Sequence, residues 1–113
     1  MTEPIKAFLG EWHITKMDKW ASDAINLISQ GNFIFDPDGM GSFLFIAVRG
    51  FTDCRYAQHD GKPFVEFSWQ GRDERDEACG RGWAVIEMDR SMTGHIFFHC
   101  GEDSSFKAEL DNV

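Results

Sequence analysis

The stretch FVEFSWQGRDERDEACGRGWAVIEM, from Phe64 to Met88, decides the fold of this chain. Two runs rich in apolar and aromatic residues, each with a tryptophan (Trp69 and Trp83), flank a charged centre that contains glycine. Strands favour half-buried aromatic and β-branched side chains, whereas turns favour polar residues and glycine. The pattern predicts a β-hairpin with strands over Phe64–Gln70 and Trp83–Met88 and a long, elaborate loop between them.

Strand signals continue on both sides of this hairpin. The turns at Asp36-Pro37-Asp38-Gly39 and Asp60-Gly61 have typical hairpin chemistry, and Gly50 predicts a further break. The predicted strands are Gly10–Thr15, Asn32–Phe35, Ser42–Val48, Asp53–Ala57, Phe64–Gln70, Trp83–Met88, His95–Cys100 and Ser105–Leu110. Eight strands with short connections can close into an antiparallel up-and-down β-barrel, which leaves no exposed sheet edge. We therefore predict an all-β fold with one domain over residues 1–113.

The connection after the first strand has a different apolar period. Its apolar residues recur at steps of three and four, which is typical of one face of a helix: Met17, Trp20, Ala21, Ala24, Ile25 and Ile28. This pattern predicts one helix between Asp18 and Ser29 that covers an end of the barrel, after a short leader at residues 1–6. A plug that fills the barrel end and a lid over a pocket are both open as roles for this helix.

Composition excludes several classes of function. The formal net charge of −8 argues against nucleic acid and anionic membranes as partners, because both need clustered Lys and Arg. The three cysteines lack CxxC spacing, so neither a disulfide scaffold nor a zinc ribbon is expected. The sequence has no signal-peptide pattern and no run of about 20 apolar residues. These features predict a cytoplasmic protein with free thiols, and the 11 Phe and 4 Trp predict a core or a pocket built from aromatic rings.

Gly10-Glu11-Trp12 on the first strand, followed by a connection with a helix and then a strand meander, resembles the calycin group. This group comprises lipocalins, fatty-acid-binding proteins and avidin-like barrels. The resemblance implies that Trp12 lies across the closed end of the barrel. Two features depart from the lipocalin pattern: the last strand offers Lys107 where lipocalins commonly have an arginine, and the chain is shorter and has no terminal helix. The resemblance implies no catalytic residues.

Residue alternation divides the three central strands into two faces. One face combines aromatic and titratable side chains: Phe64, Glu66, Ser68, Trp83, Val85, Glu87, His95, Phe97 and His99. The other is apolar apart from a thiol and an indole N–H: Val65, Phe67, Trp69, Ala84, Ile86, Met88, Ile96, Phe98 and Cys100. We predict that the second face is the packed core. The first is either an outer wall, whose rings would then favour a homodimer, or the lining of a polar cavity.

The expected function is binding of a small apolar or amphipathic ligand against Trp and Phe rings, with Arg81, Arg72 or Tyr56 fixing its polar end. The candidate ligand-binding residues are Tyr56, Glu66, Trp69, Arg72, Arg81, Trp83, His95 and His99. Arg81 lies between two glycines, which predicts a bulge or a close backbone approach at the strand start. Its guanidinium is expected either to bind a carboxylate or to pair with Asp73 or Asp76.

Two other functions stay open. One is an oligomeric interaction module whose barrel is filled with side chains, and the other is a small enzyme that uses Glu66 with His95 or His99 as an acid–base pair. The charged loop Gly71–Glu77 lacks the EF-hand spacing and is predicted to be a solvated loop or a ligand-selecting rim. The two histidines would be about 13 Å apart on one strand, too far to share a metal ion. Neither a metal nor a cofactor is therefore expected.

Overall fold

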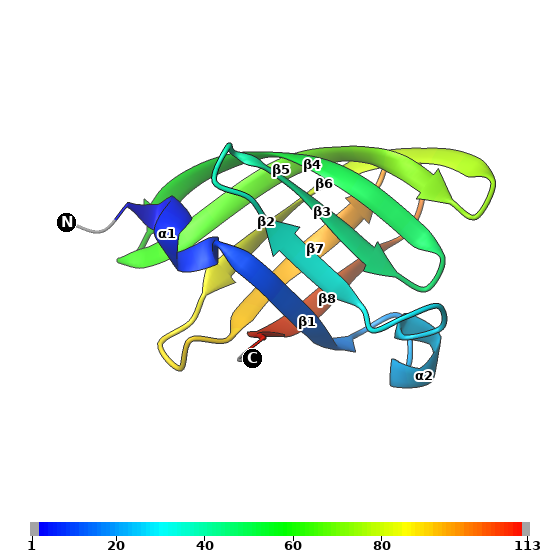
Figure 1. Ribbon diagram of the computed structural model, residues 1–113, viewed down its shortest axis with the longest axis horizontal. Coiled ribbons are helices and arrows are strands. Elements are labelled where there is room, and N and C mark those ends of the chain that lie inside the picture. The colour runs from blue at the N-terminus through cyan, green and yellow to red at the C-terminus, as the bar shows by residue number, and fades with distance from the viewer. Residues whose placement is uncertain (1–2, 112–113) are drawn as a thin grey trace.

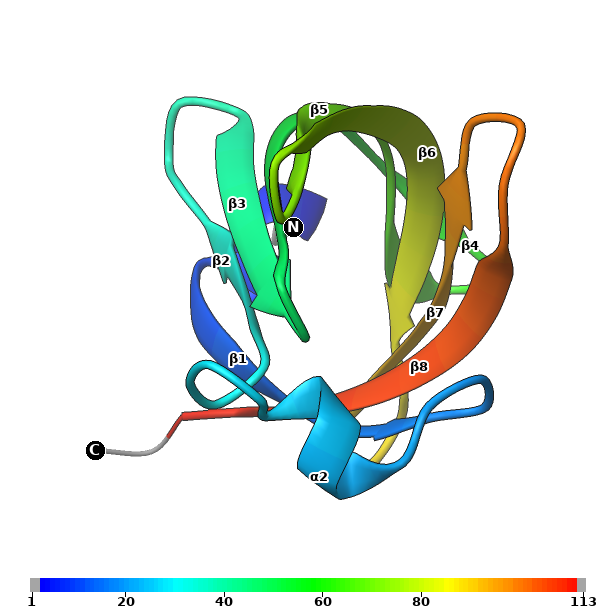
Figure 2. The same cartoon turned by 90° about the vertical axis from the view of Figure 1, so that its right-hand side faces the viewer.

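The chain forms a closed barrel of eight antiparallel strands in the computed structural model, which describes residues 3–111 (Figure 1). The strands are β1 (Gly10–Met17), β2 (Asn32–Phe35), β3 (Met40–Phe45), β4 (Val48–His59), β5 (Lys62–Asp73), β6 (Asp76–Ile86), β7 (Met92–Phe98) and β8 (Asp103–Leu110). Each strand pairs with the next one, and β8 pairs with β1 to close the ring (Figure 2). The predicted all-β, up-and-down barrel is confirmed.

Aromatic rings fill the interior of the barrel. Phe33 is fully buried near the middle, and its ring centroid lies 4.6 Å from that of Phe106 and 5.4 Å from that of Phe43. Val65, Phe67 and Trp69 point inward from β5, as the alternation predicts, and all are buried. The apolar face of the central strands is therefore the core. Two residues predicted for this core, Met88 and Cys100, lie outside it. β6 ends at Ile86 and β7 at Phe98, so both residues lie in turns and are exposed.

One end of the barrel is closed by Trp12 and a short helix, α1 (Pro4–Phe8). Trp12 is 1% exposed, and its Nε1–H donates a hydrogen bond of 2.9 Å to the carbonyl oxygen of Phe8. Phe8 itself is fully buried and packs against Phe35. The prediction of a short leader over residues 1–6 did not include α1, because five residues carry too little helical periodicity to detect.

The opposite end is covered by α2 (Ser22–Ile25), which is much shorter than the predicted helix over residues 18–29. Met17 belongs to β1, and Leu27 and Ile28 are 64% and 56% exposed, so the apolar stripe does not lie on one helix. Ile25 is nonetheless buried. The Trp20 ring, which precedes α2, lies 5.6 Å from that of Phe45. These two side chains act as the plug at this end.

The central hairpin is longer than predicted and has a shorter loop. β5 and β6 stay paired as far as Asp73 and Asp76, so only two residues separate the strands. Gly80 stands within β6 because a Cβ there would lie 1.8 Å from the Phe97 carbonyl oxygen. Gly50 is likewise inside β4, where the Phe43 ring occupies the space a side chain would need. Both glycines allow close packing in strands and do not mark turns. Among residues 3–111, no helix is long and apolar enough to cross a membrane.

Candidate functional site

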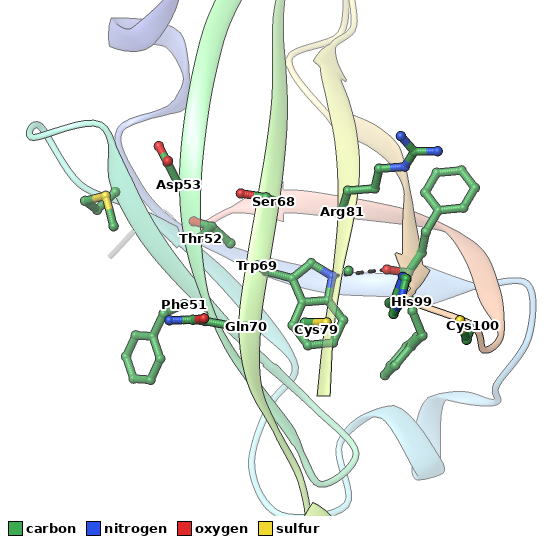
Figure 3. Close-up of a pocket in the computed structure, with 14 residues that line it drawn as sticks. Phe51, Thr52, Asp53, Ser68, Trp69, Gln70, Cys79, Arg81, His99 and Cys100 are labelled. Atoms are coloured by element: carbon green, nitrogen blue, oxygen red, sulfur yellow. Dashed lines mark hydrogen bonds between the residues drawn. The ribbon is translucent and has the colours of Figure 1, made fainter. Parts of the chain in front are cut away.

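A groove of about 950 Å³ runs across the outer wall of β4, β5, β6 and β7 (Figure 3). We call it the outer groove, and its principal outward-facing residues are Phe51, Gln70, Cys79, Arg81, Phe97 and His99. Its volume is in the range of small-molecule sites. The groove is open to solvent.

Strand register explains why these side chains gather on one surface. Asp53, Ser68 and Arg81 are opposite one another on β4, β5 and β6 and form one row. Phe51, Gln70 and Cys79 form the next row, two residues further along each strand. His99 extends this second row, because its N–H donates a hydrogen bond of 2.7 Å to the Cys79 carbonyl oxygen. Side chains two residues apart share a face, so both rows point away from the core.

The core holds the wall beneath the groove in place. The Trp69 indole packs edge-on against Phe43 and Phe98 inside the barrel, with ring centroids 5.0 and 5.2 Å apart. Its Nε1–H reaches past Gly80 and donates a hydrogen bond of 3.2 Å to the Phe97 carbonyl oxygen (Figure 3). This bond links β5 to β7 across β6. The groove is therefore formed mainly by paired strands of the barrel wall, with His99 and Cys100 contributed by the turn after β7.

Arg81 supplies a cationic side chain to the outer groove. Asp53 shares its row, but that carboxylate is paired with Arg55 at 2.5 Å. Within residues 3–111, the Arg81 guanidinium forms no ion pair, so the expected pairing with Asp73 or Asp76 is not present. A planar guanidinium with unused N–H groups can bind a carboxylate or a phosphate through two parallel hydrogen bonds.

The groove continues toward the tip of the central hairpin. This second part has a volume of about 710 Å³ and shares Phe51, Gln70, Cys79 and His99 with the first. It adds Arg49 and Arg72, which are directly opposite each other on β4 and β5. We call this second part the hairpin end of the outer groove. Glu77 also lines this part, which therefore holds two guanidinium groups and one carboxylate.

Two cysteines in the chain have very different surroundings. Cys54 points into the barrel and is buried, with its sulfur 3.3 Å from the Thr52 hydroxyl. Burial raises the pKa of the Cys54 thiol, and the Thr52 hydrogen bond opposes that rise. Cys79 is exposed and lies in the outer groove. A thiol reagent should therefore react at Cys79 and leave Cys54 intact.

The structure brings together two of the predicted ligand-binding residues, Arg81 and His99, in the outer groove. Trp69 is instead a core residue, and its buried indole lies beneath the groove. Arg72 lines its hairpin end. Glu66 lies beside Arg81 in a small adjoining hollow of about 280 Å³.

Trp83 and His95 lie apart from the outer groove. They border another hollow of about 380 Å³, together with Lys16 and Lys107 from β1 and β8. On the outer wall, the Phe64 ring stacks between His59 and Trp83, with centroids 3.8 and 6.3 Å away. These rings partly cover one another, which leaves Trp83 38% exposed.

Tyr56 points into the barrel instead of into the groove. Its ring lies 5.5 Å from that of Phe8, and its buried hydroxyl has no hydrogen-bond partner. Burial is the main reason that the pKa of Tyr56 is raised far above its ordinary value, with a smaller contribution from Cys54. The Cys54 and Tyr56 side chains form no hydrogen bond of standard geometry.

Glu66 and His95 are not in contact as an acid–base pair. Trp83 stands between them in the register, opposite Glu66 on one side and His95 on the other. His95 bonds instead to Asp103 through Nε2, at 2.5 Å. In the part of the chain that the structure describes, no group of three or more His, Cys, Asp or Glu side chains could hold a metal ion.

Several groove residues were not among the sequence candidates: Arg49, Phe51, Ser68, Gln70, Cys79 and Phe97. Alternation had already placed Ser68 and Phe97 on the mixed face, and Gln70 is in a predicted strand. Arg49, Phe51 and Cys79 could have been placed outward only if Gly50 and Gly80 had been recognised as strand residues. Comparisons of the chain with protein families, curated proteins and solved structures find no significant match.

Proposed function

We propose that the protein binds a small, partly apolar ligand with an anionic group in the outer groove, outside the barrel. The observation that carries the proposal is a free Arg81 guanidinium in a groove with two aromatic side chains, Phe51 and Phe97. Phe51 is 67% exposed, an unusual environment for such a large apolar ring. Rings supply contact area for an apolar body, and the guanidinium supplies orientation.

The packing inside the barrel favours the outer groove over an interior site. The centroid of the Phe33 ring lies within 6.2 Å of the ring centroids of four other residues: Phe35, Phe43, Phe67 and Phe106. An eight-stranded barrel is just wide enough for side chains to fill or for one small ligand to bind. Rings packed at this spacing fill the interior of the barrel, which favours a ligand site on the outer wall.

Membership of the calycin group is part of the same proposal. The closed eight-stranded meander and the buried Trp12 at one end are compatible with that architecture. If the chain belongs there, its binding site has moved from the barrel interior to the outer wall of β4–β7. The aromatic residues that would line an interior cavity then serve as core.

Thiol protection tests the site directly. We would use 2-naphthoate as the probe and alkylate Cys79 with iodoacetamide in a Cys100→Ser background, since Cys79 and Cys100 are the exposed thiols. Saturating 2-naphthoate is expected to slow alkylation of Cys79 at least severalfold. Calorimetry would measure the affinity independently.

Variants separate groove binding from non-specific adsorption. Arg81→Gln should weaken 2-naphthoate binding, whereas Arg90→Gln, which makes the same charge change in the turn after β6, should not. Protection that is unaltered in Arg81→Gln would contradict the role of Arg81. Alkylation at the same rate with and without the probe, together with no heat of binding, would contradict the proposed function.

A further inference from the structure

We infer that the ligand of the outer groove is elongated and carries an anionic group at each end, one bound by Arg81 and the other by Arg49 and Arg72. This inference rests on the proposed function and specifies its ligand class. Carboxylate and phosphate groups share the required chemistry, because both match the planar fork of a guanidinium.

Arginine is concentrated on this wall, although the chain as a whole is acidic. The chain has a formal net charge of −8 and six arginines. Four of the six lie on the outward-facing positions of β4, β5 and β6: Arg49, Arg55, Arg72 and Arg81. Arg55 is neutralised by Asp53. The other three line the outer groove or its hairpin end. In the described residues they form no ion pair with the carboxylates that also line it, Asp53 and Glu77, so their guanidinium groups are available to an anion.

The Arg49–Arg72 pair is unfavourable without a ligand. Like charges directly opposite on neighbouring strands destabilise a sheet, and these two residues are register partners. Glu77 is opposite Arg72 on its other side, but no ion pair joins them in the described residues. Arg72 donates only one hydrogen bond of 3.3 Å, to the Arg75 carbonyl oxygen. An anion between Arg49 and Arg72 would relieve the repulsion and use their remaining N–H groups.

Spacing along the strands sets the length of the ligand. Arg81 is the register partner of Ser68, and Arg72 follows four residues later on β5. Four residues of strand correspond to about 13 Å. The surface between the two cationic ends is formed by Phe51, Gln70 and Cys79, which is suitable for an apolar body. A ligand with a single anionic group could use only one end.

The test compares three probes that share one aromatic body: biphenyl-4,4′-dicarboxylate, biphenyl-4-carboxylate and biphenyl-4-carboxamide. Calorimetry on the full chain should give tighter binding for the dicarboxylate than for the monocarboxylate. The expected gain is roughly three- to tenfold, because exposed ion pairs contribute up to about 1 kcal/mol each and about 1.4 kcal/mol is a factor of ten. The gain should disappear at an ionic strength of about 1 M, where screening is strong.

Variants assign the two ends. Arg49→Gln and Arg72→Gln should each reduce dicarboxylate binding toward that of the monocarboxylate and leave the monocarboxylate nearly unchanged. Arg81→Gln should weaken both acids. Arg75→Gln is the matched control, because it removes the same charge from the tip of the same hairpin and lines no part of the groove.

Outcomes distinguish this inference from the proposed function. Equal affinity for the mono- and dicarboxylate, or equal effects of Arg49→Gln and Arg75→Gln, would overturn the two-ended ligand and leave the groove as a single-anion site. Failure of all three probes to bind would overturn the proposed function as well. If the carboxamide bound as tightly as the acids, an anionic group would not be needed for binding. That result would contradict the anionic part of the proposed function as well as the two-ended ligand.

Discussion

The two faces of β4, β5 and β6 differ sharply although they alternate along the same strands. The inner face packs rings such as Phe67 and Trp69 with almost no exposure, whereas the outer face leaves Phe51 and Arg81 open to solvent. Because the side-chain period of a strand is two, neighbouring residues serve separate purposes. Stability should therefore depend on the inner face and ligand binding on the outer face, with few positions that affect both.

The largest effect is expected at the centre of the inner face. Phe33→Ala removes a fully buried ring that packs on four others, and such truncations cost about 3–5 kcal/mol. Denaturant unfolding followed by tryptophan fluorescence would measure the loss. Phe33→Leu, which keeps most of the volume, is expected to cost clearly less. Equal losses in the two variants would mean that the core does not depend on close ring packing.

Gly80→Ala tests the position where the two faces meet. A Cβ there would collide with the Phe97 carbonyl oxygen, which accepts the Trp69 hydrogen bond. Overpacking of this kind costs about 1–3 kcal/mol, and the shifted wall should also weaken 2-naphthoate binding. The control is Ser68→Ala, at an exposed position on the adjacent strand, which should change stability by less than about 0.5 kcal/mol. A destabilised Gly80→Ala with unaltered probe affinity would show that the wall does not shape the groove.

Tyr56→Phe should change stability in the opposite direction. It removes a buried hydroxyl without a hydrogen-bond partner, and relief of that cost should raise the free energy of unfolding by about 1 kcal/mol. The pKa of Tyr56 is raised in the folded protein, so the unfolded chain loses this proton first as the pH rises.

The pH dependence gives a second measurement on Tyr56. The wild type should lose stability as the pH rises above about 10, the ordinary pKa of tyrosine, whereas Tyr56→Phe should lose less over the same range. Urea unfolding at neutral pH and at about pH 10.5 would compare the two proteins. A lower stability of the variant at neutral pH would instead indicate that the hydroxyl has a stabilising partner.

Phe51→Ala should have the smallest effect on stability and a clear effect on binding. The ring is 67% exposed on the outer face, so its loss should change the free energy of unfolding by less than about 0.5 kcal/mol. The affinity for 2-naphthoate should fall, because the ring is part of the groove. Thermal unfolding and calorimetry on the same sample would test both statements, and a large fall in stability would contradict the separation of the two faces.

Alternation predicted the barrel and most of its inner face, apart from Met88 and Cys100, which lie in turns. Val65, Phe67 and Trp69 follow a strict period of two with polar residues between them, and each is buried. The same signal failed where glycine stands inside a strand. Gly50 was interpreted as a break, yet it lies inside β4 and gives space to the Phe43 ring. The close backbone approach expected beside Arg81 is present, because Gly80 gives space to the Phe97 carbonyl group, but it lies within β6 and not at its start.

The outer groove could not be predicted for a related reason. Arg49 and Phe51 lie on either side of Gly50, so the predicted break removed both from the strand. The groove also depends on how β4, β5 and β6 bend together, and a linear pattern carries no information on that curvature. The helix prediction failed because Met17 and Trp20 fit a helical period by spacing alone, although Met17 is the last residue of β1.

The seam between β1 and β8 has a consequence for the kinetics of folding. Seven of the eight strand pairings join consecutive strands, and only this one joins residues as distant as Trp12 and Leu110. Closing so long a chain segment has a large entropic cost, which local hairpins do not share. We expect the β4–β5–β6 hairpins to form early and the β1–β8 pairing to form last. Contacts that form after the transition state affect mainly the unfolding rate, so substitutions in the seam should mainly accelerate unfolding.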